Sequence, residues 1–69
     1  MSVEIMSRRI SVIERTWPEA TMGARAGLVD ELGEISTSLG RITGAEAERA
    51  EWLTRRLNRV IRKMGDAPR

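Results

Sequence analysis

Apolar residues recur three and four positions apart along three stretches of this chain, and this spacing decides what the chain can fold into. The clearest stretch contains Leu28, Leu32, Ile35, Leu39 and Ile42. The last stretch contains Ala50, Leu53, Leu57, Val60 and Met64. The first stretch contains Val3, Met6, Ile10, Ile13 and Trp17. Residues at these spacings share one face of an α-helix, so each stretch predicts a helix with a single apolar face.

The first two helices are separated by a segment that contains Pro18. Proline lacks a backbone N–H and disfavours helical geometry at the residue before it, so it interrupts one helix but suits the first position of the next. We therefore expect helices at about 2–15 and about 18–41. Ile5 and Val12 lie beside the first apolar face, one heptad apart, and are expected to widen its buried side.

The third helix has the clearest ends in the sequence. Thr43 and Glu46 have the spacing of a capping box, in which two side chains satisfy backbone N–H groups at a helix start. Acidic residues follow early in the helix and basic residues late, which matches the helix macrodipole. Gly65 suits a left-handed residue that ends a helix. We expect a helix at about 45–64 and a frayed tail at 65–69.

These elements predict a single small all-α domain over residues 1–69. The short joint between the second and third helices favours an antiparallel helical hairpin. The first helix either folds back to complete a three-helix bundle or reaches across to a second copy in a dimeric helical bundle. We expect a homodimer, because the first helix has a complete apolar face and a chain this short buries only about 60% of its unfolded surface. The expected core contains Leu28, Leu32, Ile35, Leu39, Ile42, Leu53, Leu57, Val60, Ile61 and Met64.

The composition removes most catalytic designs. The chain has no His and no Cys, so it lacks the base and the nucleophile of serine-triad and thiol chemistry. No glycine-rich loop follows a strand pattern, which excludes a phosphate-cradling motif. Glu31 with Glu34, and Glu48 with Glu51, have the spacing of divalent-metal ligands, but nearby Arg residues favour salt-bridged surface carboxylates. We expect no enzyme activity, no cofactor and no metal.

The same composition bears on location. Without Cys there is no disulfide framework. No apolar run approaches the roughly 20 residues that a membrane-spanning helix needs, and the N-terminus has no signal-peptide pattern. We therefore expect a cytoplasmic protein with no membrane contact.

Positive charge is concentrated in the last part of the chain. Residues 1–54 contain six Arg and nine acidic residues, whereas residues 55–69 contain five Arg and one Lys against one Asp. On a helical wheel Trp52 lies about 110° from the apolar face of the third helix, among these cations. Trp and Arg are the residues most enriched in binding hot spots. The expected partner contacts are Trp52, Arg55, Arg56, Arg59, Arg62 and Lys63.

Three functions fit this Trp–Arg face. The leading hypothesis is a small non-enzymatic interaction module, an adaptor or inhibitor-type regulator that docks on a larger protein. The first alternative is a nucleic-acid-binding dimeric hairpin whose Arg-rich helix neutralises phosphates. The second alternative is a structural subunit of a larger assembly. A separate question is whether the first helix or a second copy covers Trp52, which would make the indole part of the packing rather than a binding anchor.

Overall fold

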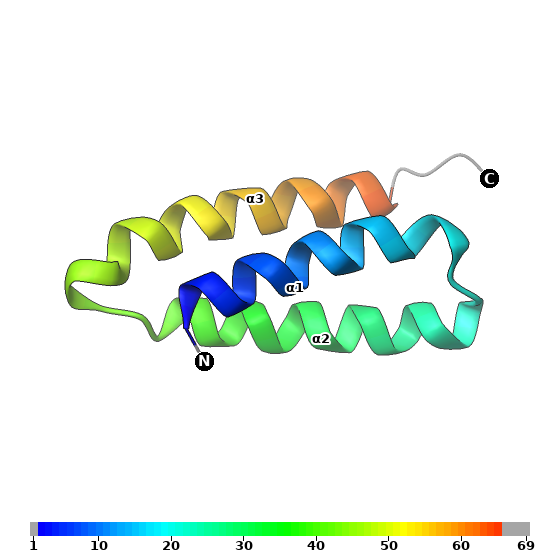
Figure 1. Cartoon of the computed structure of the whole chain (residues 1–69), viewed down its shortest axis with the longest axis horizontal. Coiled ribbons are helices and arrows are strands. Elements are labelled where there is room, and N and C mark those ends of the chain that lie inside the picture. Colours follow the sequence, from blue (N-terminus) through cyan, green and yellow to red (C-terminus); the bar gives the residue numbers. More distant parts are fainter. Residues whose placement is uncertain (1, 66–69) are drawn as a thin grey trace.

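The computed structural model describes residues 2–65 and consists of helices joined by short turns (Figure 1). In chain order the elements are α1 (Val3–Thr16), η1 (Trp17–Glu19), α2 (Met22–Gly40), η2 (Gly44–Glu46) and α3 (Ala47–Gly65), where η marks a short 3₁₀ turn. The prediction of an all-α chain with three helices is confirmed for the described part, which has no strand. Most of the expected tail, residues 66–69, lies outside the described residues.

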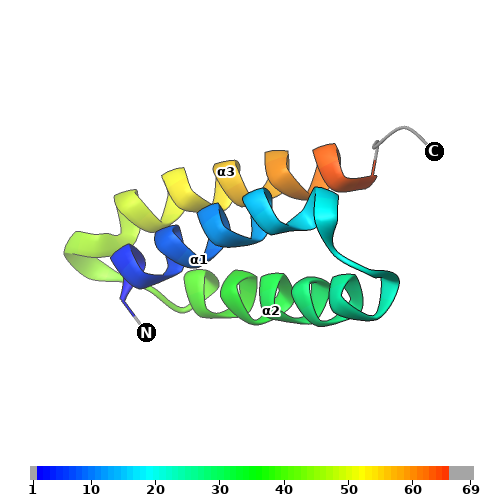
Figure 2. The same cartoon turned by 45° about the vertical axis from the view of Figure 1, so that its right-hand side comes forward.

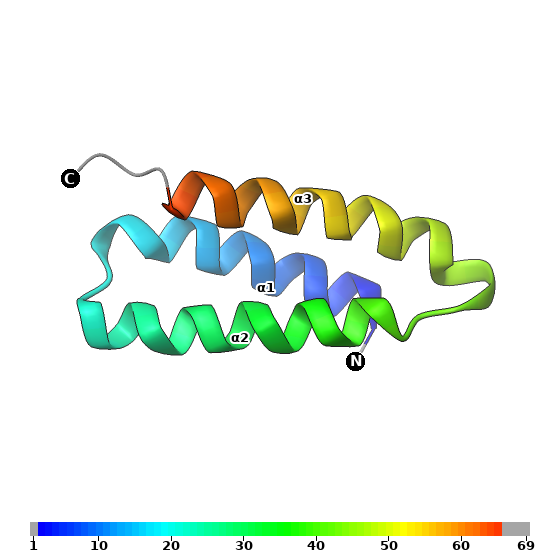
Figure 3. The ribbon, with the colours of Figure 1, turned by 180° about the vertical axis from the view of Figure 1, so that it is seen from behind.

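The three helices lie side by side, and α1 runs along both of the others (Figure 1, Figure 2 and Figure 3). A single cluster of buried apolar side chains draws on all three. It contains Met6, Ile10, Ile13, Leu32, Ile35, Leu39, Ala50, Leu53, Leu57 and Val60. The apolar face of α1 is therefore used within its own chain, and any dimer would need a different surface.

Most of the expected core residues are buried or lie at the edge of the core. Leu28, Ile42 and Met64 are partly buried and pack against the central cluster. The prediction for Ile61 was wrong, because 45% of its surface is exposed. A step of one residue turns a helix by about 100°, so Ile61 follows the buried Val60 but points away from the core.

The start of α1 is capped by Ser2, whose Oγ accepts a hydrogen bond from the Ile5 N–H at 3.2 Å.

The junction between α1 and α2 differs from the prediction. Pro18 lies in the 3₁₀ turn, which α2 does not continue, since Ala20 has extended backbone angles. The start of α2 at Met22 is set by Thr21, whose Oγ1 accepts from the Ala24 N–H at 3.2 Å. The expected start at about residue 18 was therefore wrong by four residues.

Arg25 ties this junction to α2. Its Nε donates to the Trp17 carbonyl at 3.2 Å, and its guanidinium lies 4.8 Å from the centroid of the Trp17 ring. A guanidinium at this distance from an indole face is attracted by the π-electrons. The side chain therefore holds the 3₁₀ turn against the first turn of α2.

The turn between α2 and α3 depends on Gly44, which has a φ of +75°. Only glycine adopts this left-handed conformation without a steric cost. The capping box was wrong, because Thr43 makes no side-chain hydrogen bond to the turn that follows it. That turn is 3₁₀ rather than α-helical, so α3 proper begins at Ala47. Gly65 is the last residue of α3 and does not have the left-handed φ that was expected.

No helix among residues 2–65 is both long enough and apolar enough to cross a membrane.

Candidate functional site

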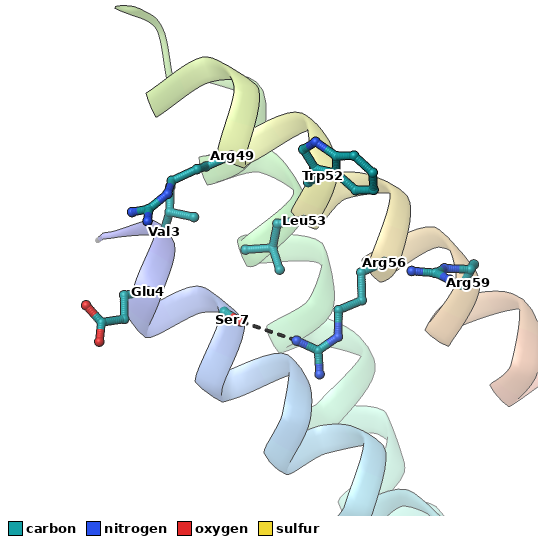
Figure 4. Close-up of a pocket in the computed structure, with 8 residues that line it drawn as sticks. All are labelled: Val3, Glu4, Ser7, Arg49, Trp52, Leu53, Arg56 and Arg59. Carbon is teal, nitrogen blue, oxygen red and sulfur yellow. Dashed lines mark hydrogen bonds between the residues drawn. The ribbon is translucent and has the colours of Figure 1, made fainter. Parts of the chain in front are cut away.

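A groove of about 630 Å³ lies between the N-terminal half of α1 and the middle of α3 (Figure 4). We call it the Trp52 groove. Its lining residues are Val3, Glu4, Ser7, Arg49, Trp52, Leu53, Arg56 and Arg59. The groove exists because α1 and α3 each turn their apolar faces to the common core, which leaves the flanks of both helices to form its walls.

Trp52 is the largest exposed apolar side chain in the groove, with 64% of its surface accessible. Neighbouring Leu53 is buried in the core, so the indole, one residue earlier, points outward. The Arg55 guanidinium lies 5.7 Å from the centroid of the Trp52 ring. Neither α1 nor any other described segment covers the indole, which leaves it accessible to a partner.

Arg56 joins α3 to α1. Its Nη2 donates to the Ser11 hydroxyl at 2.6 Å and its Nη1 to the Ser7 hydroxyl at 3.2 Å. The Ser11 hydroxyl in turn donates to the Ser7 carbonyl at 3.2 Å, and Nη2 lies 3.9 Å from Glu14 Oε1. A guanidinium presents its donors in a fixed fork, and this fork bridges two helices. The main structural contribution of Arg56 is therefore to hold α1 beside α3.

Arg49 and Arg59 supply the remaining positive charge of the groove. Within residues 2–65 neither forms an ion pair. The only acidic lining residue is Glu4, which pairs with Arg8 on its own helix at 3.2 Å and points away from Trp52 (Figure 4). The groove therefore combines an exposed indole with an excess of positive charge.

The structure brings together only part of the predicted contact set. Trp52, Arg56 and Arg59 line the groove, whereas Arg62 and Lys63 are exposed on the later turns of α3 and do not line it. Arg55 does not line the groove; its guanidinium lies 5.7 Å from the centroid of the Trp52 ring and pairs with Glu51 at 3.0 Å, one helical turn earlier.

Sequence reasoning missed Arg49 and the wall that α1 supplies. Arg49 precedes Trp52 by three residues and Arg56 by seven, so helical periodicity places it on the same face. Arg49 lies six residues before the cationic cluster that begins at Arg55, so the concentration of positive charge gives no signal for it. Val3 and Ser7 lie far from α3 in the sequence, and no local pattern indicates that they line the same groove.

The carboxylate pairs behave as surface residues. Glu31 accepts a hydrogen bond from Arg9 at 3.2 Å, and Glu51 accepts one from Arg55 at 3.0 Å. In the part of the chain that the structure describes, no three acidic side chains lie close enough together to hold a metal ion. For Glu31 and Glu51, the interpretation as salt-bridged surface carboxylates is confirmed.

No family model, no curated protein and no solved structure matches this chain.

Proposed function

We propose that this protein is a non-enzymatic interaction module that binds an acidic segment of a larger protein in the Trp52 groove. An adaptor or an inhibitor-type regulator works in this way. The main support is the position of Trp52, an indole that is 64% exposed at the edge of a groove with three Arg residues in its lining. An indole offers a large, rigid contact surface, and few other residue types contribute as much to binding.

The groove, with a volume of about 630 Å³, is open to solvent, which suits a side chain of a partner segment better than an enclosed small ligand. Leu53 and Val3 provide apolar surface beside Trp52. A large apolar side chain of a partner would bury this surface together with the exposed face of the indole.

The charge of the groove supports an acidic partner. Arg49 and Arg59 line it without an ion pair among residues 2–65. A guanidinium binds a carboxylate through two parallel hydrogen bonds, which gives direction as well as attraction. Complementary charge also accelerates the encounter with a partner. Carboxylates on either side of an apolar anchor are therefore the chemistry that fits.

Binding of nucleic acid is the competing function, and it would depend on a different set of cations on α3. The affinity for a phosphate backbone would depend on all accessible cations of α3, including Arg62 and Lys63 outside the groove. The affinity for a protein segment in the groove would depend mainly on the cations that line it. Arg59 and Arg62 therefore separate the two functions, because they stand three residues apart on α3 and only Arg59 lines the groove.

The experiment selects a displayed library of short random peptides for binding to the full chain, and measures affinities by fluorescence anisotropy. We expect enriched peptides to place Asp or Glu beside a large apolar residue. Trp52→Ala should weaken the best peptide by about 30-fold or more, since a hot-spot Trp contributes 2 kcal/mol or more. The control Ile61→Ala changes an exposed apolar residue of α3 outside the groove and should leave affinity unchanged.

The charge variants are measured with the best peptide and with labelled DNA and RNA. Arg59→Ala should weaken peptide binding clearly more than Arg62→Ala. Failure to enrich acidic peptides would contradict the proposal. Equal losses for the two variants, together with tight oligonucleotide binding that falls about 100-fold or more between 50 and 200 mM salt, would favour nucleic acid instead.

A further inference from the structure

The Trp52 groove follows two helices that run in the same direction. α1 and α3 are parallel to each other and antiparallel to α2 (Figure 1 and Figure 3). Arg56 of α3 donates to the hydroxyls of Ser7 and Ser11 on α1, which keeps the two helices side by side along the groove. A groove with this course is suited to an elongated segment that lies along both helices.

Four polar and aromatic side chains of the groove come from one side of α3 (Figure 4). They are Arg49, Trp52, Arg56 and Arg59, at spacings of three, four and three residues. Arg49 and Arg59 are exposed, and neither forms an ion pair among residues 2–65. Ten residues separate them, which is about 15 Å along the helix axis. Available positive charge therefore lies on both sides of the indole, closer on one side than on the other.

We propose, on the basis of the proposed function, that the acidic segment bound by the Trp52 groove is an amphipathic helix that lies antiparallel to α1 and α3. A helix beside α3 has the same rise per residue, so residues on one of its faces can match the spacing of the α3 side chains. Its acidic residues then stand ten positions apart. An extended segment would cover the same 15 Å in about four or five residues.

The direction of the bound helix follows from the order of the helices already present. α1, α2 and α3 run up, down and up (Figure 1), and a fourth helix beside α3 and α1 completes an up-down-up-down bundle if it is antiparallel to both. Opposed helix dipoles favour the same direction. The partner chain then passes Arg59 first, Trp52 seven positions later and Arg49 after three more. The expected motif has an acidic residue at position 1, a large apolar residue at position 8 and an acidic residue at position 11.

The other flank of α1 also exposes apolar side chains but offers no comparable charge. Ile5 and Val12 are 47% and 49% exposed there, so the prediction that they widen the buried side of the helix was wrong. Arg8 and Arg9 beside them both pair with carboxylates of the same chain at 3.2 Å. The groove, in contrast, has two cations that are open to an acidic helix.

Peptides that carry the expected motif test the conformation, with affinity for the full chain measured by fluorescence anisotropy. A covalent link between residues four apart, on the face turned away from the groove, should tighten binding by about tenfold, because less conformational freedom is lost. Proline at the centre of the same peptide should weaken binding by at least about tenfold, since it breaks a helix. The composition control moves the second acidic residue to five positions after the first and should bind clearly more weakly. Circular dichroism should show a gain of helix when the unlinked peptide binds.

A charge exchange tests the direction. Arg59→Glu should weaken binding of the motif peptide, and replacing the first acidic residue of the peptide by Lys should restore most of the affinity for this variant. Replacing the second acidic residue by Lys should instead restore binding to Arg49→Glu. The opposite pairing would overturn the antiparallel arrangement. Circular dichroism of both protein variants excludes unfolding as the cause.

Two results would overturn the bound helix, and they differ in what they mean for the proposed function. Peptides that require Trp52, tolerate proline and prefer acidic residues four or five positions apart would show an extended segment, and the proposed function would stand. If no acidic peptide bound in a way that Trp52→Ala abolishes, the helix and the proposed function would both be wrong.

Discussion

Replacing Leu57 by Ala tests the central statement about the fold, that one core is shared by all three helices. Leu57 is fully buried in the cluster that α1, α2 and α3 build together. Its removal leaves a cavity that no single helix can close by a small shift. Ile61, four residues later on α3, was expected in the same core but is 45% exposed, which makes Ile61→Ala the matched control.

The expected losses of unfolding free energy for Leu57→Ala and Ile61→Ala differ by several-fold. A buried Leu→Ala change destabilises a protein by about 2–5 kcal/mol, because lost burial and the residual cavity add together. A chain of 69 residues has a total stability of about 3–10 kcal/mol, so this change removes a large part of it. Ile61→Ala should cost about 0.5 kcal/mol, since half of the side chain is in water and Ala is the better helix former.

Thermal and urea unfolding, followed by circular dichroism at one fixed protein concentration, measure both variants. In a domain of this size each kcal/mol shifts Tm by about 4–8 °C. Leu57→Ala should therefore lower Tm by at least about 10 °C or abolish the transition, and Ile61→Ala should lower it by about 4 °C or less. Equal losses for the two variants would refute the placement of the core.

Three further predictions concern the junctions and the α1–α3 contact, each measured by urea unfolding. Thr21→Ala should destabilise the chain by about 1 kcal/mol, because it removes the cap of α2. Thr43→Ala should destabilise it clearly less, since the Thr43 side chain makes no capping hydrogen bond. A larger loss for Thr43→Ala would show that Thr43 does cap the helix. Gly44→Ala should destabilise by about 1 kcal/mol, since its φ is +75°. Gly27→Ala should stabilise the chain by about the same amount, since Gly27 lies in a helix with open space around it. If both glycine variants changed the free energy of unfolding in the same direction, this prediction would be contradicted. Arg56→Lys should destabilise the chain by about 1 kcal/mol although the charge is kept, because an ammonium cannot reproduce the fork that spans two hydroxyls. An unchanged urea midpoint would show that Arg56 does not hold α1 beside α3.

Helical periodicity was sufficient to predict the three helices and most of the buried faces. The proline and capping rules misplaced the helix starts at Pro18 and Thr43, because 3₁₀ turns at Trp17–Glu19 and Gly44–Glu46 come before α2 and α3. Periodicity itself failed at Ile61, because an apolar residue at the border of a helix face is buried only if a neighbouring helix reaches it. That depends on how the helices pack, which the spacing does not define.

Only the α3 side of the candidate site could be predicted from the sequence, because the α1 side depends on how the helices pack. The position of Trp52 off the apolar face follows from the helical wheel alone, and the structure leaves this side chain exposed. The wall formed by Val3 and Ser7 is a tertiary feature, created when α1 lies beside α3. Arg56 looked like any other cation of its helix, and only its contact with two serines of α1 distinguishes it.

The position of Arg56 has a thermodynamic consequence. The same side chain lines the Trp52 groove and fastens α1, whose first turns form the opposite wall. The groove therefore exists only in molecules whose α1 is docked. Any ligand of the groove must then raise the melting temperature in proportion to the logarithm of its concentration above Kd, because it binds the docked state alone. A thermal shift would thus detect a genuine ligand without a label, and variants that loosen α1 would lose affinity even when every residue that touches the ligand is intact.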